Sequence, residues 1–124
     1  MRVSHVNLYS KNNERLLKFY RDMVGLKPLS KQSTKDDWYG FATKGVIFAV
    51  EPESNRTKIP FKFNRKNPVL IQFKANSKPH LERINKQLEK KGIRLLRKSQ
   101  RRSYGTITNF LDPDRNLVEI LAEK

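Results

Sequence analysis

Residues 110–121, FLDPDRNLVEIL, decide the fold of this chain more than any other stretch. The DPD tripeptide at 112–114 predicts a turn, because proline fixes φ and aspartate side chains bond nearby backbone groups. The branched apolar residues that follow predict a β-strand over residues 117–122. Glu119 interrupts the apolar pattern of that strand. A carboxylate in such a place faces either solvent or a pocket.

The composition predicts one soluble globular domain: 124 residues, of which 36% are hydrophobic and 31% are charged. No apolar run approaches the ~20 residues of a membrane span, and the first ten residues lack the apolar centre of a secretory signal. We therefore expect a cytoplasmic protein with no membrane partner. The absence of cysteine excludes disulfides, thiolate metal sites and cysteine nucleophiles, and leaves His5 and His80 as nitrogen ligands for a metal.

The net charge of +15 is unevenly distributed along the chain. Fourteen of the 27 cations lie between Glu53 and Glu82 or between Glu89 and Asp112, in two stretches without an acidic residue. Such a surface attracts anions, whether nucleic acid, an anionic metabolite or an acidic protein. Charge alone does not choose among them, and a merely solubilising surface is an equal alternative.

The order of predicted elements repeats once along the chain. A strand, a helix and three strands occupy about residues 3–51, and the same order returns over residues 69–122 after a basic, proline-containing segment. The expected strands are near 3–8, 26–31, 38–43, 46–51, 69–75, 93–98, 104–111 and 117–122. The expected helices begin after Asn12 or Asn13 and after Ser77, and they end at Gly25 and Gly92.

A constant offset relates the two halves. Leu8 and Phe73 are 65 positions apart, and so are Leu16 and Leu81, whereas Gly25 and Gly92 are 67 apart. An offset that holds across a strand and a helix indicates a duplicated module.

Four segments carry a resemblance to a known superfamily: SHVNLY at 4–9, ERLLKFYRDMVGLKP at 14–28, LERINKQLEKKGI at 81–93 and FLDPDRNLVEIL. Together they resemble the glyoxalase, bleomycin-resistance and extradiol-dioxygenase superfamily, also called vicinal oxygen chelate proteins. The resemblance covers nearly the whole chain and departs from the family at Arg115, where glycine is usual. It implies an α+β fold of a single domain, with two βαβββ modules at about 1–54 and 67–124 and a basic linker between them.

The resemblance also implies where a ligand would bind. Mixed sheets of the two modules would curl into a cup, with the helices packed outside and a small-molecule site inside. Relatives commonly pair two chains, so a homodimer is expected.

In that family four inward residues commonly hold a divalent metal, and here two of the four positions carry a ligand. These are His5 and Glu119. The constant offset relates His5 to Leu70, and the remaining position falls on Phe48, or on Ala49 if the register slips by one. Because zinc sites use three or four ligands, we expect no cofactor. An incomplete zinc, nickel, manganese or iron site at His5 and Glu119 is the alternative.

Strand alternation predicts the lining of the cup. If His5 and Glu119 face it, the period of two brings these side chains to the same side: Asn7, Tyr9, Phe48, Val50, Leu70, Gln72, Lys74, Leu117 and Leu121. The opposite faces, with Val6, Leu8, Ile71 and Val118 among them, would pack on the helices.

The site has further candidates. Gln72 is a possible substitute oxygen ligand, and Arg101 and Arg102 are rim cations that suit an anion. Trp38, Tyr39 and Tyr104 could supply apolar aromatic surface. For the aromatic residues a core or rim position is an equal alternative, and for the arginines a solvated loop is one.

Three functions stay open at this point. The first is a protein with a degenerate metal site whose cup binds a small anionic or aromatic molecule. The second is a metal-dependent lyase, isomerase, thiol transferase or dioxygenase, in which Glu119 is the candidate catalytic proton shuttle. The third is a nucleic-acid-associated basic protein, although the sequence holds no motif of a known nucleic-acid reader. His80, in the first turn of the second helix, is expected to be an exposed residue without a catalytic role.

Overall fold

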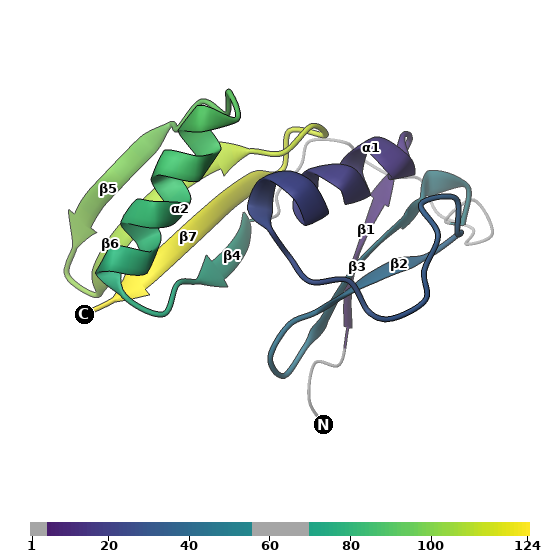
Figure 1. Ribbon diagram of the computed structural model, residues 1–124, viewed down its shortest axis with the longest axis horizontal. Coiled ribbons are helices and arrows are strands. Elements are labelled where there is room, and N and C mark those ends of the chain that lie inside the picture. Colours follow the sequence, from purple (N-terminus) through teal and green to yellow (C-terminus); the bar gives the residue numbers. More distant parts are fainter. Residues whose placement is uncertain (1–4, 56–69) are drawn as a thin grey trace. The chain divides into compact units, whose positions relative to one another are not determined.

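The computed structural model describes residues 5–55 and 70–124 of the chain, which belong to two compact units (Figure 1). The first unit contains β1 (His5–Ser10), α1 (Asn13–Lys18), the π-helical segment η1 (Phe19–Val24), β2 (Tyr39–Ala42), β3 (Ile47–Pro52) and the 3-10 turn η2 (Glu53–Asn55). The second unit contains β4 (Leu70–Lys74), α2 (Lys78–Lys90), β5 (Arg97–Arg102), β6 (Gly105–Leu111) and β7 (Leu117–Glu123).

Each unit is built on its own mixed sheet. The strand order is β1-β3-β2 in the first sheet and β4-β7-β6-β5 in the second. The first and last strands of each unit, β1 with β3 and β4 with β7, pair in parallel, while the other pairs are antiparallel. The predicted α+β fold with two curled, unclosed sheets is confirmed.

The repeat predicted from the sequence is visible in the positions of the elements. Helices α1 and α2 begin at Asn13 and Lys78, so they keep the offset found in the sequence. The residues that cap the two helices, Asn12 and Ser77, keep it as well. Equivalent residues of the two units can therefore be compared directly.

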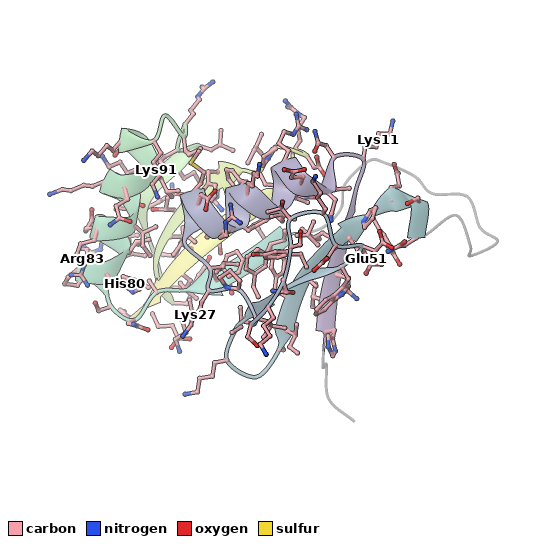
Figure 2. All side chains as sticks on the ribbon, turned by 45° about the vertical axis from the view of Figure 1, so that its right-hand side comes forward. Lys11, Lys27, Glu51, His80, Arg83 and Lys91 are labelled. Carbon is pink, nitrogen blue, oxygen red and sulfur yellow. The ribbon has the colours of Figure 1, made fainter. Side chains whose placement is uncertain are left out.

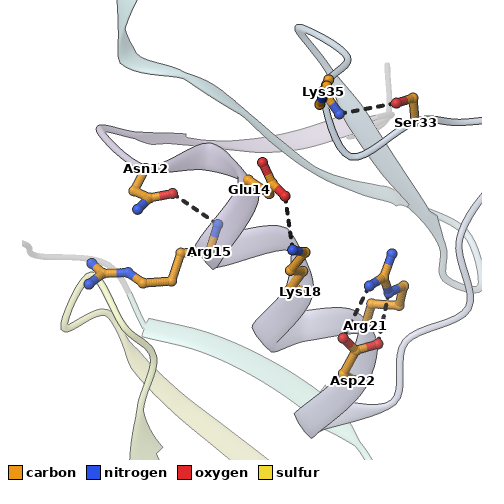
Figure 3. Close-up of polar contacts among 8 residues, drawn as sticks. All are labelled: Asn12, Glu14, Arg15, Lys18, Arg21, Asp22, Ser33 and Lys35. Carbon is orange, nitrogen blue, oxygen red and sulfur yellow. Dashed lines mark hydrogen bonds and ion pairs between the residues drawn. The ribbon is translucent and has the colours of Figure 1, made fainter.

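Helix α1 begins where the sequence predicts. The side chain of Asn12 accepts a hydrogen bond from the backbone N–H of Arg15 at 3.1 Å, which satisfies a helix N-terminal donor (Figure 3). One turn on, Lys18 lies 2.8 Å from Glu14, and their hydrogen bond and charge attraction lower the pKa of Glu14. Gly25 ends the helical segment at a φ of 87°, which glycine adopts without steric cost.

Helix α2 packs on one face of the second sheet, against β5, β6 and β7 (Figure 1). Its apolar side chains Leu81 and Leu88 are buried, and so are Ile71 and Val118 of the sheet. Burial of each large side chain contributes about 1.5–3 kcal/mol. The opposite face of α2 is charged, and Arg83 projects from it (Figure 2).

His80 is a capping residue of α2. Its backbone N–H donates to Ser77 Oγ at 3.2 Å, and its ring Nδ1 accepts from the backbone N–H of Asn76 at 3.0 Å. This reciprocal pair satisfies backbone donors at the helix start, and it fixes the ring with its hydrogen on Nε2. His80 is half-buried by these contacts, so the prediction of an exposed side chain is corrected to this extent.

Two predicted strands differ from the structure. Residues 26–31 form only an isolated bridge between Pro28 and Phe41, because Pro28 has no N–H to donate and Lys31 turns the chain at a φ of 58°. The strand expected at 93–98 is β5, shifted to Arg97–Arg102, and a bulge at Ser99 interrupts its pairing with β6. Arg101 and Arg102 therefore belong to a strand and not to a loop.

Several predictions fall on residues 1–4 and 56–69, outside the described part of the chain: the first residues of two predicted strands, most of the basic linker and the module boundary near residue 67. Among the described residues, no helix reaches both the length and the hydrophobicity that a membrane crossing requires.

Candidate functional site

One face of the second sheet is polar at its centre. Glu119 of β7 lies beside Gln72 of β4 and beside Asn109 of β6, and residues paired in this way share a face of the sheet. Six of the predicted residues lie on this common face: Leu70, Gln72, Lys74, Leu117, Glu119 and Leu121.

The carboxylate of Glu119 is held by two side-chain amides. Gln72 Nε2 donates to Oε1 at 2.6 Å, and Asn109 Nδ2 donates to Oε2 at 3.0 Å. Glu119 is 7% exposed, although it stands at the centre of a sheet face. The two carboxamides stabilise the charge and fix its direction, but they are neutral and do not cancel it.

Next to Glu119 lies an open cavity of about 590 Å³, which we call the arginine pocket. It is lined by Arg97, Arg101 and Arg102 of β5, by Ser103 and Tyr104 of the following turn, and by Ile107 and Glu119. Ile107 is buried, whereas Tyr104 is 51% exposed at the rim. The pocket thus joins three cations, one aromatic ring and one carboxylate.

The cationic side chains of β5 differ in whether they form an ion pair or a hydrogen bond. Lys98 lies 2.7 Å from Glu89 of α2, an ion pair that raises the pKa of Lys98. Within residues 5–55 and 70–124, the side chains of Arg97, Arg101 and Arg102 have no hydrogen bond or ion pair. Guanidinium groups without a partner at a cavity are suited to bind an anion, because each offers several donors in a fixed plane.

The faces predicted for the fourth strand are wrong. Phe48 pairs with Val6 and Val50 pairs with Leu8, so both lie on the helix side of the first sheet, opposite to His5. Phe48 packs against Tyr20 of η1 with ring centroids 4.9 Å apart, and Val50 is fully buried. Ala49, the alternative that a slip of one residue gives, is the residue that shares the face of His5.

The first unit places other residue types where the second has its polar cluster. Asn7, Ala49 and Gly40 are paired as Gln72, Glu119 and Asn109 are. Instead of a carboxylate, this face carries the indole of Trp38, whose Nε1 donates to Asn7 Oδ1 at 3.2 Å.

His5 belongs to the surroundings of this indole. Its ring lies 6.3 Å from the Trp38 ring between centroids. His5, Asn7 and Tyr9 are exposed on this face, whereas Tyr39 is buried and packs on Phe41 with centroids 5.3 Å apart.

Gly40 gives Trp38 its place on the sheet. A Cβ at position 40 would lie 2.7 Å from Trp38 Cζ3 and 2.8 Å from Leu29 Cδ1, closer than van der Waals contact. We therefore expect Gly40→Ala to lift the indole off the sheet and to destabilise this unit by about 1–3 kcal/mol. The emission of Trp38, the single tryptophan, should shift to longer wavelength.

Asn7→Ala is the control for this prediction. It removes the hydrogen bond to the indole but leaves the packing of the indole on Gly40 intact, so the emission of Trp38 should shift less. An emission spectrum of Gly40→Ala identical to that of the unchanged protein would show that the indole does not rest there.

The residues at the four family ligand positions do not fit a divalent metal. Leu70 and Ala49 supply no donor atom, so at most two of the four positions, His5 and Glu119, carry a ligand, fewer than the three or four of a zinc site. Gln72, the predicted substitute ligand, turns its amide nitrogen toward Glu119. No group of three or more His, Asp or Glu side chains arranged to hold a metal occurs among the described residues. His5 and Glu119 lie in different units, and each is described within its own.

Two residues of the polar face escape the sequence analysis: Asn109 and Arg97. Asn109 sits between Thr108 and Phe110 in a strand of mixed character, so its side of the sheet depends on the register with β7. Arg97 pairs with Asn109 across the bulge at Ser99, which the sequence does not predict. The sequence held one signal for Asn109. If Ile107 points inward, alternation along β6 places Asn109 on the same face.

Comparison with known proteins agrees with the fold. The family model described as "Glyoxalase/Bleomycin resistance protein/Dioxygenase superfamily" matches residues 2–120. A glyoxalase-related enzyme from Fulvimarina pelagi superposes with a TM-score of 0.81 at 17% identity, over 98% of this chain and 88% of that one. A lactoylglutathione lyase from Agrobacterium tumefaciens superposes with a TM-score of 0.75 at 20% identity, over 96% and 91% of the two chains.

An integron cassette protein from the mobile metagenome of V. Cholerae is similar as well, with a TM-score of 0.77 at 18% identity over 100% of this chain and 96% of that one. No curated protein matches the sequence. The structural neighbours share the fold at low identity, and the family model covers nearly the entire sequence. The chain therefore belongs to the glyoxalase, bleomycin resistance protein and dioxygenase superfamily.

Proposed function

We propose that this protein binds a small anionic molecule in the arginine pocket of its second unit and does so without a metal. The observation that supports this most is the presence of three arginines, without side-chain partners among the described residues, in the lining of one cavity. The register puts Arg97 and Arg102 on the face of Glu119, whereas Arg101 pairs with Thr106 of the opposite face. The net charge of +15 adds a long-range attraction for the same ligand.

The pocket offers groups for both parts of such a ligand. Arg97 and Arg102 flank the sheet face that carries Glu119, since they pair with Asn109 and Gly105 of β6. They can hold a phosphonate, phosphate or carboxylate group through paired N–H donors. Tyr104, which is exposed, supplies the apolar surface for the remainder of the ligand.

The absence of a metal is part of the proposal. The donor set at the family ligand positions consists of His5 and Glu119, and a carboxylate held by two amides is suited to accept a hydrogen bond from a ligand. Protein treated with a chelator should therefore bind the anion as tightly as untreated protein.

A homodimer and a cytoplasmic location stay predictions. Light scattering that gives the mass of one chain would contradict the homodimer.

Titration calorimetry with ethylphosphonate at low ionic strength tests the binding. We expect one saturable site per chain, and Arg102→Ala should weaken it about tenfold, because a charge-assisted hydrogen bond is lost. Arg83→Ala is the matched control. It removes the same charge from the exposed side of α2, so it reports the effect of the net charge alone (Figure 2).

Equal affinity of the Arg102→Ala and Arg83→Ala proteins for ethylphosphonate would show that the overall positive charge of the protein, and not the arginine pocket, attracts the anion. Failure of the unchanged protein to bind ethylphosphonate would contradict the proposed function.

A further inference from the structure

We propose that the ligand of the arginine pocket is a zwitterion, with an anionic group for the arginines and an ammonium group for Glu119. This inference rests on the proposed function and adds the chemical class of the ligand. Its basis is the placement of one buried carboxylate in a cavity whose other charged lining residues are all arginines.

Glu119 retains the capacity to bind a donor. A carboxylate oxygen accepts about two hydrogen bonds, and each oxygen of Glu119 receives one, from Gln72 or from Asn109. One acceptor position on each oxygen is therefore left. The amides hold the carboxylate in place, so a ligand donor meets an acceptor that is already oriented.

A cationic donor suits this position best. Buried charges are normally paired, and among the described residues no cation lies within ion-pair distance of Glu119. The other carboxylate on this side of β7, Glu123, is already paired with Lys74 at 2.7 Å. An ammonium group of the ligand would supply for Glu119 the partner that Glu123 has in Lys74.

The net charge of the protein and recognition by Glu119 favour different ligands, which allows a test that separates them. A field of +15 attracts a ligand according to its negative charge, so it favours ethylphosphonate over 2-aminoethylphosphonate, whose ammonium group cancels one charge. Recognition by Glu119 favours 2-aminoethylphosphonate. The two effects have opposite signs, and the order of the two affinities separates them.

The experiment compares both ligands by titration calorimetry with chelator-treated protein at about pH 9, where both phosphonate groups are doubly ionised and the ammonium group keeps its proton. We expect 2-aminoethylphosphonate to bind about fivefold or more tightly than ethylphosphonate. In Glu119→Gln this preference should vanish or reverse, while ethylphosphonate binds as before or more tightly. The substitution is well tolerated sterically, because Asn109 can turn its amide and offer Oδ1, which has no hydrogen bond in the described structure, to the new NH₂ group.

Each outcome decides one claim. If the unchanged protein binds 2-aminoethylphosphonate no better than ethylphosphonate, the zwitterion is wrong and the proposed anion site stands. A preference that survives in Glu119→Gln would show that another group binds the ammonium. If neither ligand binds, the proposed function fails and this inference fails with it. The comparison of two ligands on the unchanged protein needs no variant, so it holds even if Glu119→Gln does not fold.

Discussion

Gly105→Ala is expected to lower the free energy of unfolding by about 3 kcal/mol, through backbone strain and a steric clash together. Gly105 has a φ of 153°, a backbone conformation that side chains disfavour. A Cβ there would also meet the carbonyl oxygen of Ala122 and lie 3.0 Å from Glu123 Cα, both backbone atoms of β7. The ladder between β6 and β7 holds these atoms in place, so the clash forces the end of the sheet apart.

Gly92→Ala separates the clash from the backbone strain. Gly92 has a φ of 81°, but a Cβ there would meet nothing within 4 Å. Only the conformational cost applies, so a loss of about 1 kcal/mol is expected. Urea unfolding of both variants measures the difference, and equal losses would show that the contact with β7 can relax.

Gly105→Ala also has a consequence for binding. Gly105 follows the turn of Ser103 and Tyr104, which lines the arginine pocket. A sheet end forced apart displaces this turn, so Gly105→Ala should also weaken ethylphosphonate binding in protein that remains folded. Gly92→Ala, at the far end of α2, should leave the affinity unchanged.

Asp112→Ala is expected to cost about 2–4 kcal/mol, the second large effect, because several hydrogen bonds to one buried carboxylate are lost. The side chain is 4% exposed and closes the turn before β7. Its Oδ1 accepts from the backbone N–H groups of Asp114 and Asn116 at 2.9 and 2.8 Å, and Oδ2 accepts from Asn116 Nδ2 at 2.7 Å. Alanine leaves these donors without their acceptor, and hydrogen bonds to a charged group are among the strongest in a protein.

Asp112→Asn provides the graded comparison. It keeps an oxygen for the two backbone N–H groups and replaces the oxygen that faces Asn116 by a donor. We expect less than half the loss of Asp112→Ala in urea unfolding. If both substitutions cost the same, the charge and not the hydrogen-bond geometry stabilises the turn.

The sequence predicted the segment around this turn well, because its information is local. Aspartate, proline and the branched residues after them act within a few positions, and the turn and β7 form as expected. The repeat was also predictable, since the constant offset between the two halves is a property of the sequence alone.

The faces of β3 were not predictable in the same way. Ile47, Phe48, Ala49 and Val50 are all apolar, so alternation does not show which of them face the helix. Pairing with β1 decides it, and this pairing is a contact between segments that are distant in the sequence. The arginine pocket has the same origin: the bulge at Ser99 and the register of β5 with β6 determine which cations meet Glu119.

The most direct test of the anion site is a titration of ethylphosphonate followed by NMR of the arginine side chains. In protein labelled with ¹⁵N, the Nε–H signals of Arg97 and Arg102 should shift together and saturate at one equivalent of bound ligand. The signal of Arg83 should move only slightly, because it senses the ionic strength alone. Shifts spread evenly over all arginines, without saturation, would contradict a built site and would leave only a positively charged surface.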